Sequence, residues 1–292
     1  MSARLIDPLI QKQLEKFGLT DKTRLTSVKS AEKFLKNVGI ALRYWRAEKL
    51  PLASLYQAAV GSIETPPKEK NVHGISLREE GQRIAIELTN HLLASHQGIE
   101  VNVIANRIAI VHRDLIPSLY ALVRHYRPPD DLKGISKQAR EVFQFIEQSK
   151  ETTAGLVRKF IGIPAGDLNN DPAYNALAEL QSHFLIDRGP FLMRKSGIPY
   201  LSKEGYPYHL FHRVHADLVG AATKITREDA VSNFIYGYLN GAVFANSKKL
   251  LSMFGNFITQ VEMHNAIEAL TKQKKVSVVI EKKDKIVVLN CV

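Results

Sequence analysis

The chain has 292 residues, 45% of them hydrophobic, so it can bury a sizeable core and is long enough for two or three modules. Its formal net charge of +11 favours polyanions such as nucleic acid, or an anionic membrane surface. The single cysteine, Cys291, excludes an internal disulfide and a cysteine-based metal site, and no stretch approaches the roughly 20 apolar residues of a membrane span. We therefore expect a soluble, cytoplasmic protein with no cofactor, no metal and no membrane partner.

Helical patterns dominate the first part of the chain, where apolar residues recur at helical spacing and glycine or proline stands at positions typical of helix ends. Residues 101–111 fit neither the helical nor the strand period. We expect a module over 1–133 that is either helical or a divergent winged helix. The predicted helices are 31–38 ending at Gly39, one with Pro51 in its first turn that ends at Gly61, one capped by Ser76 and Glu79, and 115–126.

The segment 134–215 has the order typical of a winged-helix domain, because three helical patterns precede two strand-like segments. A basic, glycine-containing stretch over 194–205 separates those strands and predicts the wing. The same order returns over 216–292, which strengthens the inference. We therefore predict a mainly α fold with small β-hairpins (α+β), built of tandem winged-helix modules. The predicted N-caps are Ser136, Thr153 and Asp171 in the first of these modules and Thr226, Ser247 and Thr259 in the second.

From Lys29 to about Glu281 the chain resembles the AlkZ-related winged-helix proteins, relatives of the bacterial DNA glycosylases that unhook interstrand crosslinks. Most of the shared positions are apolar, so the resemblance lies at the level of fold. It rests on the segments AEKFLKNVGIALRYWRAEKLPLASLYQAAVG, DLIPSLYALVRHYRP, TAGLVRKFIGI and DPAYNALAELQSHFLIDRGP.

This resemblance implies tandem winged helices folded into a compact body that embraces DNA, with hydrolytic excision of damaged bases in the active members. Those members carry a glutamine-apolar-glutamine or glutamine-apolar-aspartate motif in the N-terminal module. Here Gln11 and Gln13 have that spacing, but Lys12 stands between them in an amphipathic helical segment. DNA glycosylase activity is therefore left open, and no catalytic residue is assigned.

A winged helix presents its third helix to the major groove and its wing to phosphates or the minor groove. We expect the third helix of 134–215 to present Asn175 and Gln181, whose amides can pair with adenine. Basic residues of the second helix, the strand, the wing and the segment Arg-Tyr-Trp-Arg are expected to contact DNA phosphates. These residues are Arg43, Arg46, Arg158, Lys159, Arg188, Arg194, Lys195 and Lys203.

Each of these signals also has a simpler interpretation. A basic face can serve solubility alone, and Arg-Tyr-Trp-Arg can equally anchor two modules to each other. Lysines around the last predicted hairpin protect an exposed strand edge from aggregation. His209, His212 and His215 recur at three-residue spacing, but His209 falls in a predicted strand, which does not favour a three-histidine metal site.

The leading hypothesis from the sequence is binding of double-stranded DNA, damaged or crosslinked DNA included, in DNA repair. The alternatives are a non-enzymatic transcriptional regulator and a protein-interaction module. An enzyme would release a base from damaged DNA, a regulator would prefer one sequence, and an interaction module would show little salt-sensitive affinity for DNA.

Overall fold

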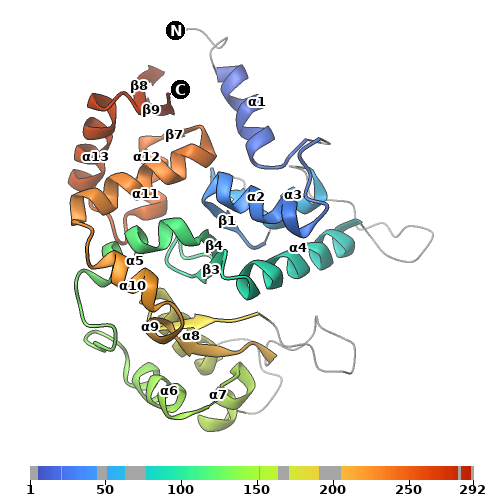
Figure 1. Ribbon diagram of the computed structural model, residues 1–292, viewed down its shortest axis with the longest axis vertical. Coiled ribbons are helices and arrows are strands. Elements are labelled where there is room, and N and C mark those ends of the chain that lie inside the picture. Colours follow the sequence, from blue (N-terminus) through green and yellow to red (C-terminus); the bar gives the residue numbers. More distant parts are fainter. Residues whose placement is uncertain are drawn as a thin grey trace.

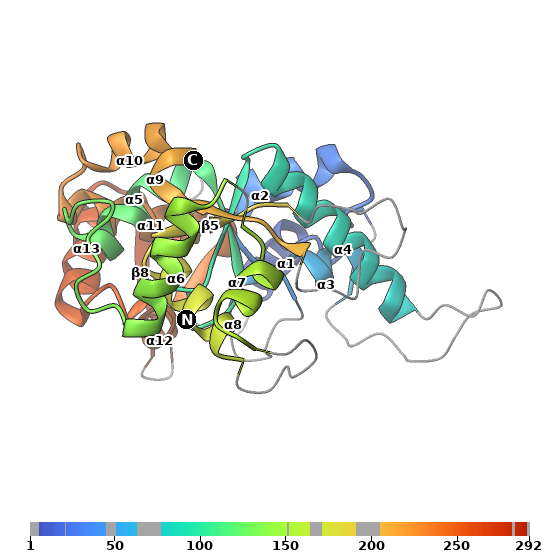
Figure 2. The same cartoon turned by 90° about the horizontal axis from the view of Figure 1, so that it is seen from below.

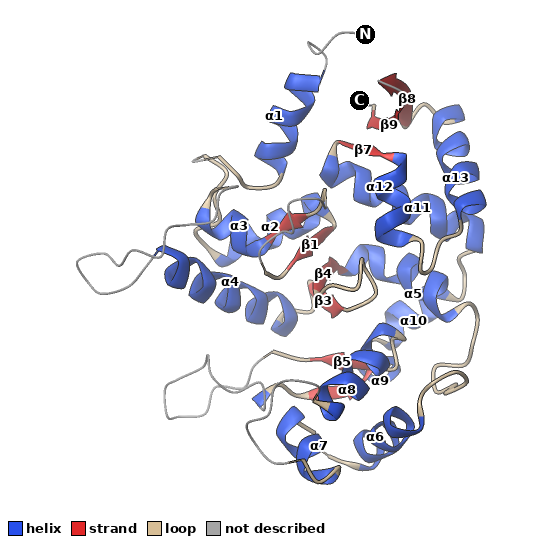
Figure 3. Ribbon diagram, turned by 180° about the vertical axis from the view of Figure 1, so that it is seen from behind, coloured by secondary structure: helices blue, strands red, loops and turns tan. Residues whose placement is uncertain are grey.

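The protein is described from a computed structural model, which covers residues 6–20, 22–44, 51–62, 77–150, 152–163, 171–190, 205–281 and 284–290. Helices dominate these residues and the strands are short (Figure 3). No described helix is both long enough and apolar enough to cross a membrane.

One order of elements occurs three times: a helix, a strand, two helices and a hairpin of two strands. The first repeat consists of α2 (Val28–Val38), β1 (Ile40–Leu42), α3 (Leu55–Val60), α4 (Leu77–Ala94), β3 (Gly98–Val101) and β4 (Ala109–His112). The third repeat consists of α11 (Arg227–Ala242), β7 (Phe244–Asn246), α12 (Ser247–Phe254), α13 (Gln260–Lys272), β8 (Val276–Glu281) and β9 (Asp284–Leu289).

The second repeat has the same order, with a single bridge between Thr153 and Pro207 in place of its first strand. Its elements are α6 (Lys137–Gln148), α7 (Ala154–Phe160), α8 (Pro172–Ser182), β5 (Ile186–Arg188) and β6 (Tyr208–Leu210). The remaining elements are α1 (Ile6–Lys16), β2 (Ala53–Ser54), a short 3-10 turn (Arg113–Leu115), α5 (Ile116–Arg124), α9 (Phe211–Val214) and α10 (Ala216–Ala222).

Strand pairing is also shared between the repeats. In the first repeat β4 pairs antiparallel with both β1 and β3, and in the third repeat β9 pairs antiparallel with both β7 and β8. In the first and third repeats, the first strand therefore joins the last hairpin in one small sheet. In Figure 1 the first repeat lies to the right, the second at the bottom and the third at the upper left, with α5 between them.

Two large hydrophobic cores result, and a small third cluster joins Tyr56 and Ala59 of α3 to Ala85 of α4. The joint core combines buried residues of the first and third repeats with α5, and the second core draws all its buried members from residues 135–210. Phe184 and Phe211, at the edge of the second repeat, pack against Tyr120 of α5 and so belong to the joint core. Figure 2, seen from below, shows α6 and α7 of the second repeat in front of the other elements.

Local sequence signals explain most helix ends. Gly39 ends α2 with a φ of 69°, and Ser136, Thr153 and Asp171 cap α6, α7 and α8 through their side chains, as predicted. Two expectations were wrong. The helix assigned to Pro51 begins at Leu55 because Ser54 caps it after a short strand, and α12 is capped by Asn246.

Candidate binding pocket between two repeats

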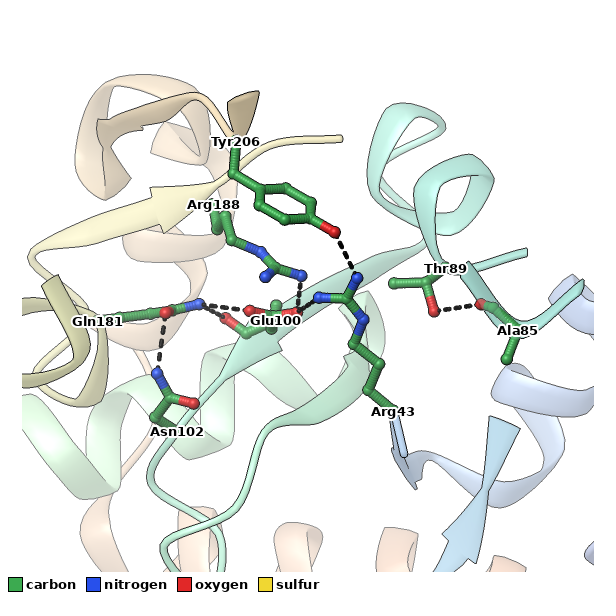
Figure 4. A network of polar contacts seen from close by, with 8 residues as sticks. All are labelled: Arg43, Ala85, Thr89, Glu100, Asn102, Gln181, Arg188 and Tyr206. Atoms are coloured by element: carbon green, nitrogen blue, oxygen red, sulfur yellow. Dashed lines mark hydrogen bonds and ion pairs between the residues drawn. The ribbon is translucent and has the colours of Figure 1, made fainter. Parts of the chain in front are cut away.

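One buried carboxylate, that of Glu100 on β3, ties the first repeat to the second (Figure 4). Its Oε2 lies 3.3 Å from Nη1 of Arg43, which follows β1, and accepts a hydrogen bond from Nη2 of Arg188 on β5. Arg43 also donates a 2.6 Å hydrogen bond to the Tyr206 hydroxyl, and the Arg188 guanidinium lies 4.1 Å from the centre of that ring. Two guanidinium groups thus share one carboxylate, so that among the described residues one positive charge has no acidic partner.

The second repeat completes the cluster through Gln181 on α8. Its Nε2 donates a 2.9 Å hydrogen bond to the backbone carbonyl of Glu100, and its Oε1 accepts one of 2.9 Å from Asn102. These bonds satisfy the polar groups of a side chain that is only 3% exposed. Gln181 therefore aligns α8 on the edge of β3.

Electrostatics keep Arg43 of this cluster charged. Burial lowers the pKa of Arg43, but the Glu100 carboxylate together with Tyr44 and Tyr206 outweighs this effect, so that its pKa is raised above the usual value. The positive charge at this interface is therefore permanent at any physiological pH.

A cavity of about 340 Å³ lies beside the cluster, between the first and second repeats. Tyr44 and Ile108 line it from the first repeat. The other lining residues belong to the second repeat and lie on or next to α7, α8, β5 and β6. The aromatic and cationic side chains that line it are Tyr44, Tyr174, Tyr206, Tyr208, Arg158 and Arg188, which we call the tyrosine pocket.

Both carboxylate oxygens of Asp171, the acidic residue in the pocket wall, are engaged in interactions within the protein. Oδ2 of Asp171 lies 2.9 Å from Nε and 2.6 Å from Nη2 of Arg158, and its Oδ1 caps α8 at the backbone N–H of Ala173. Burial raises the pKa of Tyr44 and that of Tyr208, so both phenols stay protonated at neutral pH. The pocket therefore offers aromatic faces, hydroxyl groups and guanidinium groups.

The structure corrects the expected orientation of several predicted DNA contacts. Arg158 and Gln181 were expected to point into solvent, yet they are 6% and 3% exposed because one binds Asp171 and the other binds Glu100. Arg43 and Arg188 are equally buried on Glu100, so the first arginine of Arg-Tyr-Trp-Arg anchors two repeats, as its alternative interpretation held.

The other predicted contacts divide into two groups. Lys159 and Asn175 are exposed on α7 and α8, as expected. Arg46, Arg194, Lys195 and Lys203 lie outside the described residues.

Sequence reasoning missed Glu100 and Tyr206, although each carried a signal. Glu100 is a lone acid within the apolar segment 99–104, which is typical of a buried charge that needs partners. Tyr206 lies shortly before β6, whose pairing with β5 brings it to the arginines, and only the fold reveals that proximity.

The histidine segment does not gather into one site. His209 is exposed on β6, whereas Nε2 of the buried His215 lies 2.8 Å from Oδ2 of Asp187. Within the described ranges, no three potential metal ligands lie close enough to hold an ion. In the glutamine pair, Gln11 is exposed and Gln13 donates to the backbone carbonyl of Ala242, which docks α1 on α11.

Neither a protein-family model nor a curated protein matches the chain. Among solved structures, the fold is similar to that of Streptomyces sahachiroi DNA glycosylase AlkZ, with a TM-score of 0.53 and 10% sequence identity. The match covers 95% of this chain and 68% of that chain. At this identity the likeness is one of fold, and the mainly helical α+β fold predicted from the sequence is confirmed.

Proposed function

We propose that the chain binds duplex DNA through three winged-helix units, with DNA repair as the setting. The observation that carries this proposal is the threefold repetition of one helix-strand-helix-helix-hairpin order. In a winged helix the third helix enters the major groove and the hairpin forms the wing. α4, α8 and α13 hold the third position, and we assign the units to residues 1–133, 134–215 and 216–292.

The third repeat offers a groove with several lysines, of which Lys248 pairs with Asp284. A groove of about 490 Å³ lies between α12, α13 and the hairpin β8–β9, and Lys248, Lys272 and Lys285 line it. Lys249 on α12 and Lys274, two residues after the end of α13, are also exposed. Lysines arranged in this way around a recognition helix favour contact with phosphates.

The exposed face of α13 also carries groups suited to base edges. Gln260, His264 and Asn265 are exposed along the helix. A glutamine or asparagine amide can donate to and accept from one adenine, whereas a valine or leucine cannot. In the second repeat, Asn175 on α8 and Lys159 on α7 are the corresponding exposed polar and basic groups.

Binding without hydrolysis is the simplest activity for the described residues. Asp171 and Glu100, which lie in and beside the tyrosine pocket, are both held by arginines. Carboxylate oxygens that already accept hydrogen bonds from guanidinium groups are less available to position a water for hydrolysis. Because the fold is shared with a DNA glycosylase, base release remains the reaction to assay.

The test is binding to undamaged duplex across a salt series. We expect the logarithm of the affinity to fall linearly with the logarithm of the salt concentration, since each neutralised phosphate contributes about 0.9 to the slope. The triple variant Lys272→Gln, Lys274→Gln, Lys285→Gln should weaken binding and reduce the slope by about 2.7 when all three lysines contact phosphates.

The matched control removes the same charge from the first helix of the first repeat. Lys29, Lys33 and Lys36 are exposed on α2, which is not the helix that a winged helix places in the groove. Their replacement by glutamine should leave the slope nearly unchanged. Equal losses in both triple variants would contradict the proposed surface, and release of an alkylated purine above a heat-inactivated control would add hydrolysis to binding.

A further inference from the structure

The tyrosine pocket is chemically unlike a simple contact between two packed repeats. Its wall combines four tyrosines with the guanidinium groups of Arg158 and Arg188. A volume of about 340 Å³ falls at the lower end of the range of about 300–1,000 Å³ found for small-molecule sites. The pocket therefore has room for one planar group of modest size.

Two of these tyrosines are exposed at the pocket although their rings are apolar. Tyr44 of the first repeat is 45% exposed and Tyr174 on α8 is 42% exposed, whereas Tyr208 is 7% exposed. A purely structural contact would bury all three rings. Exposed aromatic rings from two repeats that share one cavity favour a ligand that inserts between the repeats.

The charge of the pocket indicates what that ligand carries. Arg158 is balanced by Asp171, but Arg188 shares Glu100 with Arg43, so the described part of the wall retains one positive charge in excess. Arg188 is 6% exposed, and its buried Nε has no hydrogen-bond partner among the described residues. A planar aromatic group joined to a negative group matches these features.

We propose that the tyrosine pocket holds one unpaired nucleobase of a DNA strand, whose phosphodiester compensates the positive charge beside Arg188. This inference rests on the proposed function, since duplex binding delivers the strand. Every base has a π face that stacks on tyrosine, so the pocket accepts an unpaired base with little sequence preference. Stacking and pairing hold a paired base in the double helix, so extruding it costs free energy. This cost is smallest for a base in a bulge, which is already unpaired.

The test compares three duplexes of one sequence: fully paired, with a single bulged adenine, and with a bulged abasic site. The abasic bulge has the same flexibility but no base. We expect the bulged adenine to bind about tenfold more tightly than the abasic bulge, as stacking of one base predicts. Equal affinities for the two bulges would overturn the proposal.

Variants of exposed residues are used, so that a change in binding does not result from a loss of folding. Tyr174→Ala should abolish the preference for the bulged adenine and leave affinity for the paired duplex unchanged, whereas Tyr174→Phe should retain the preference because it keeps the ring. Tyr126→Ala is the control, because Tyr126 is 60% exposed and does not line the pocket. Loss of the preference in the control variant as well would overturn the assignment to the pocket.

The outcomes separate the two proposals. Salt-sensitive binding to paired duplex without any preference for the bulged adenine would remove the nucleobase pocket and keep duplex binding. Absence of binding to all three duplexes would remove both proposals together.

Discussion

The first repeat contacts its two neighbours in opposite ways. Against the third repeat it packs tightly through backbone and apolar side chains: an added Cβ at Gly241 of α11 would lie 2.3 Å from the carbonyl oxygen of Val38. Against the second repeat it uses the ionised cluster of Glu100, with Arg43 on one side and Arg188 on the other. One interface belongs to a continuous core and the other is polar and borders a cavity.

The two interfaces of the first repeat have different roles: one stabilises the fold and the other borders the proposed binding pocket. Apolar close packing stabilises the first and third repeats as one body. The buried charges must first be desolvated, so their net contribution to stability is small, but they set the register of α8 and β5 against β3. The polar interface therefore borders the tyrosine pocket, whereas α2 and α11 are closely packed where Gly241 meets Val38.

Removal of the Glu100 carboxylate should lower the free energy of unfolding more than any other change considered. Glu100→Ala leaves two buried guanidinium groups next to each other with no carboxylate, and we expect a loss of about 3–5 kcal/mol in the free energy of unfolding. Urea unfolding followed by circular dichroism measures it. The triple variant Arg43→Met, Glu100→Leu, Arg188→Met should recover most of the loss, and a loss below about 1 kcal/mol in Glu100→Ala would show that the cluster is not desolvated.

The apolar interface is tested at Gly241. Gly241→Ala places a methyl group 2.3 to 2.7 Å from the backbone of Val38, so α2 and α11 must move apart, at a cost of about 2–3 kcal/mol in unfolding free energy. The control is Gly220→Ala on α10, where an added Cβ meets nothing within 4 Å. There we expect stabilisation of about 0.5–1 kcal/mol, because alanine favours the helix. Similar results at both positions would contradict close packing at Gly241.

Local signals in the sequence predicted much of the fold. Ser136, Thr153, Asp171 and Thr259 were recognised as N-caps because a cap depends on neighbouring backbone groups alone. The strands β1 and β7 were missed because each has only three residues. Each of them pairs antiparallel with a strand at least 40 residues away along the chain, and no short window of sequence contains that strand.

The candidate site was harder to predict, for a physical reason. Gln181 follows Leu177 by four residues and therefore shares its buried face, a signal that was present but was outweighed by the polarity of the amide. The burial of Arg158 depends on Asp171, thirteen residues away, and that of Arg188 on Glu100 in another repeat. Polar residues reveal their partners only when the tertiary contacts are known.

The smallest expected effect concerns an ion pair at the edge of the joint core. Hydrogen bonds from Arg227 and the cap at Thr259 lower the pKa of Glu262 to about 2, against an ordinary value of 4.5. Since the folded pKa lies below the unfolded one, this stabilisation is fully present above about pH 4.5 and is lost as the pH falls through about 2.

Glu262→Gln keeps the capping box on α13 and removes the charge, so we expect a loss of about 1–2 kcal/mol at pH 7 that shrinks steadily below pH 4.5. Urea unfolding of both proteins at pH 7, 4 and 3 measures this difference. Its persistence at pH 3 at the full value would mean that packing around Arg227, and not the ion pair, joins α11 to α13. Apolar packing would then stabilise the joint core even at its edge. The joint core would differ still more from the interface at Glu100, which is held by ion pairs.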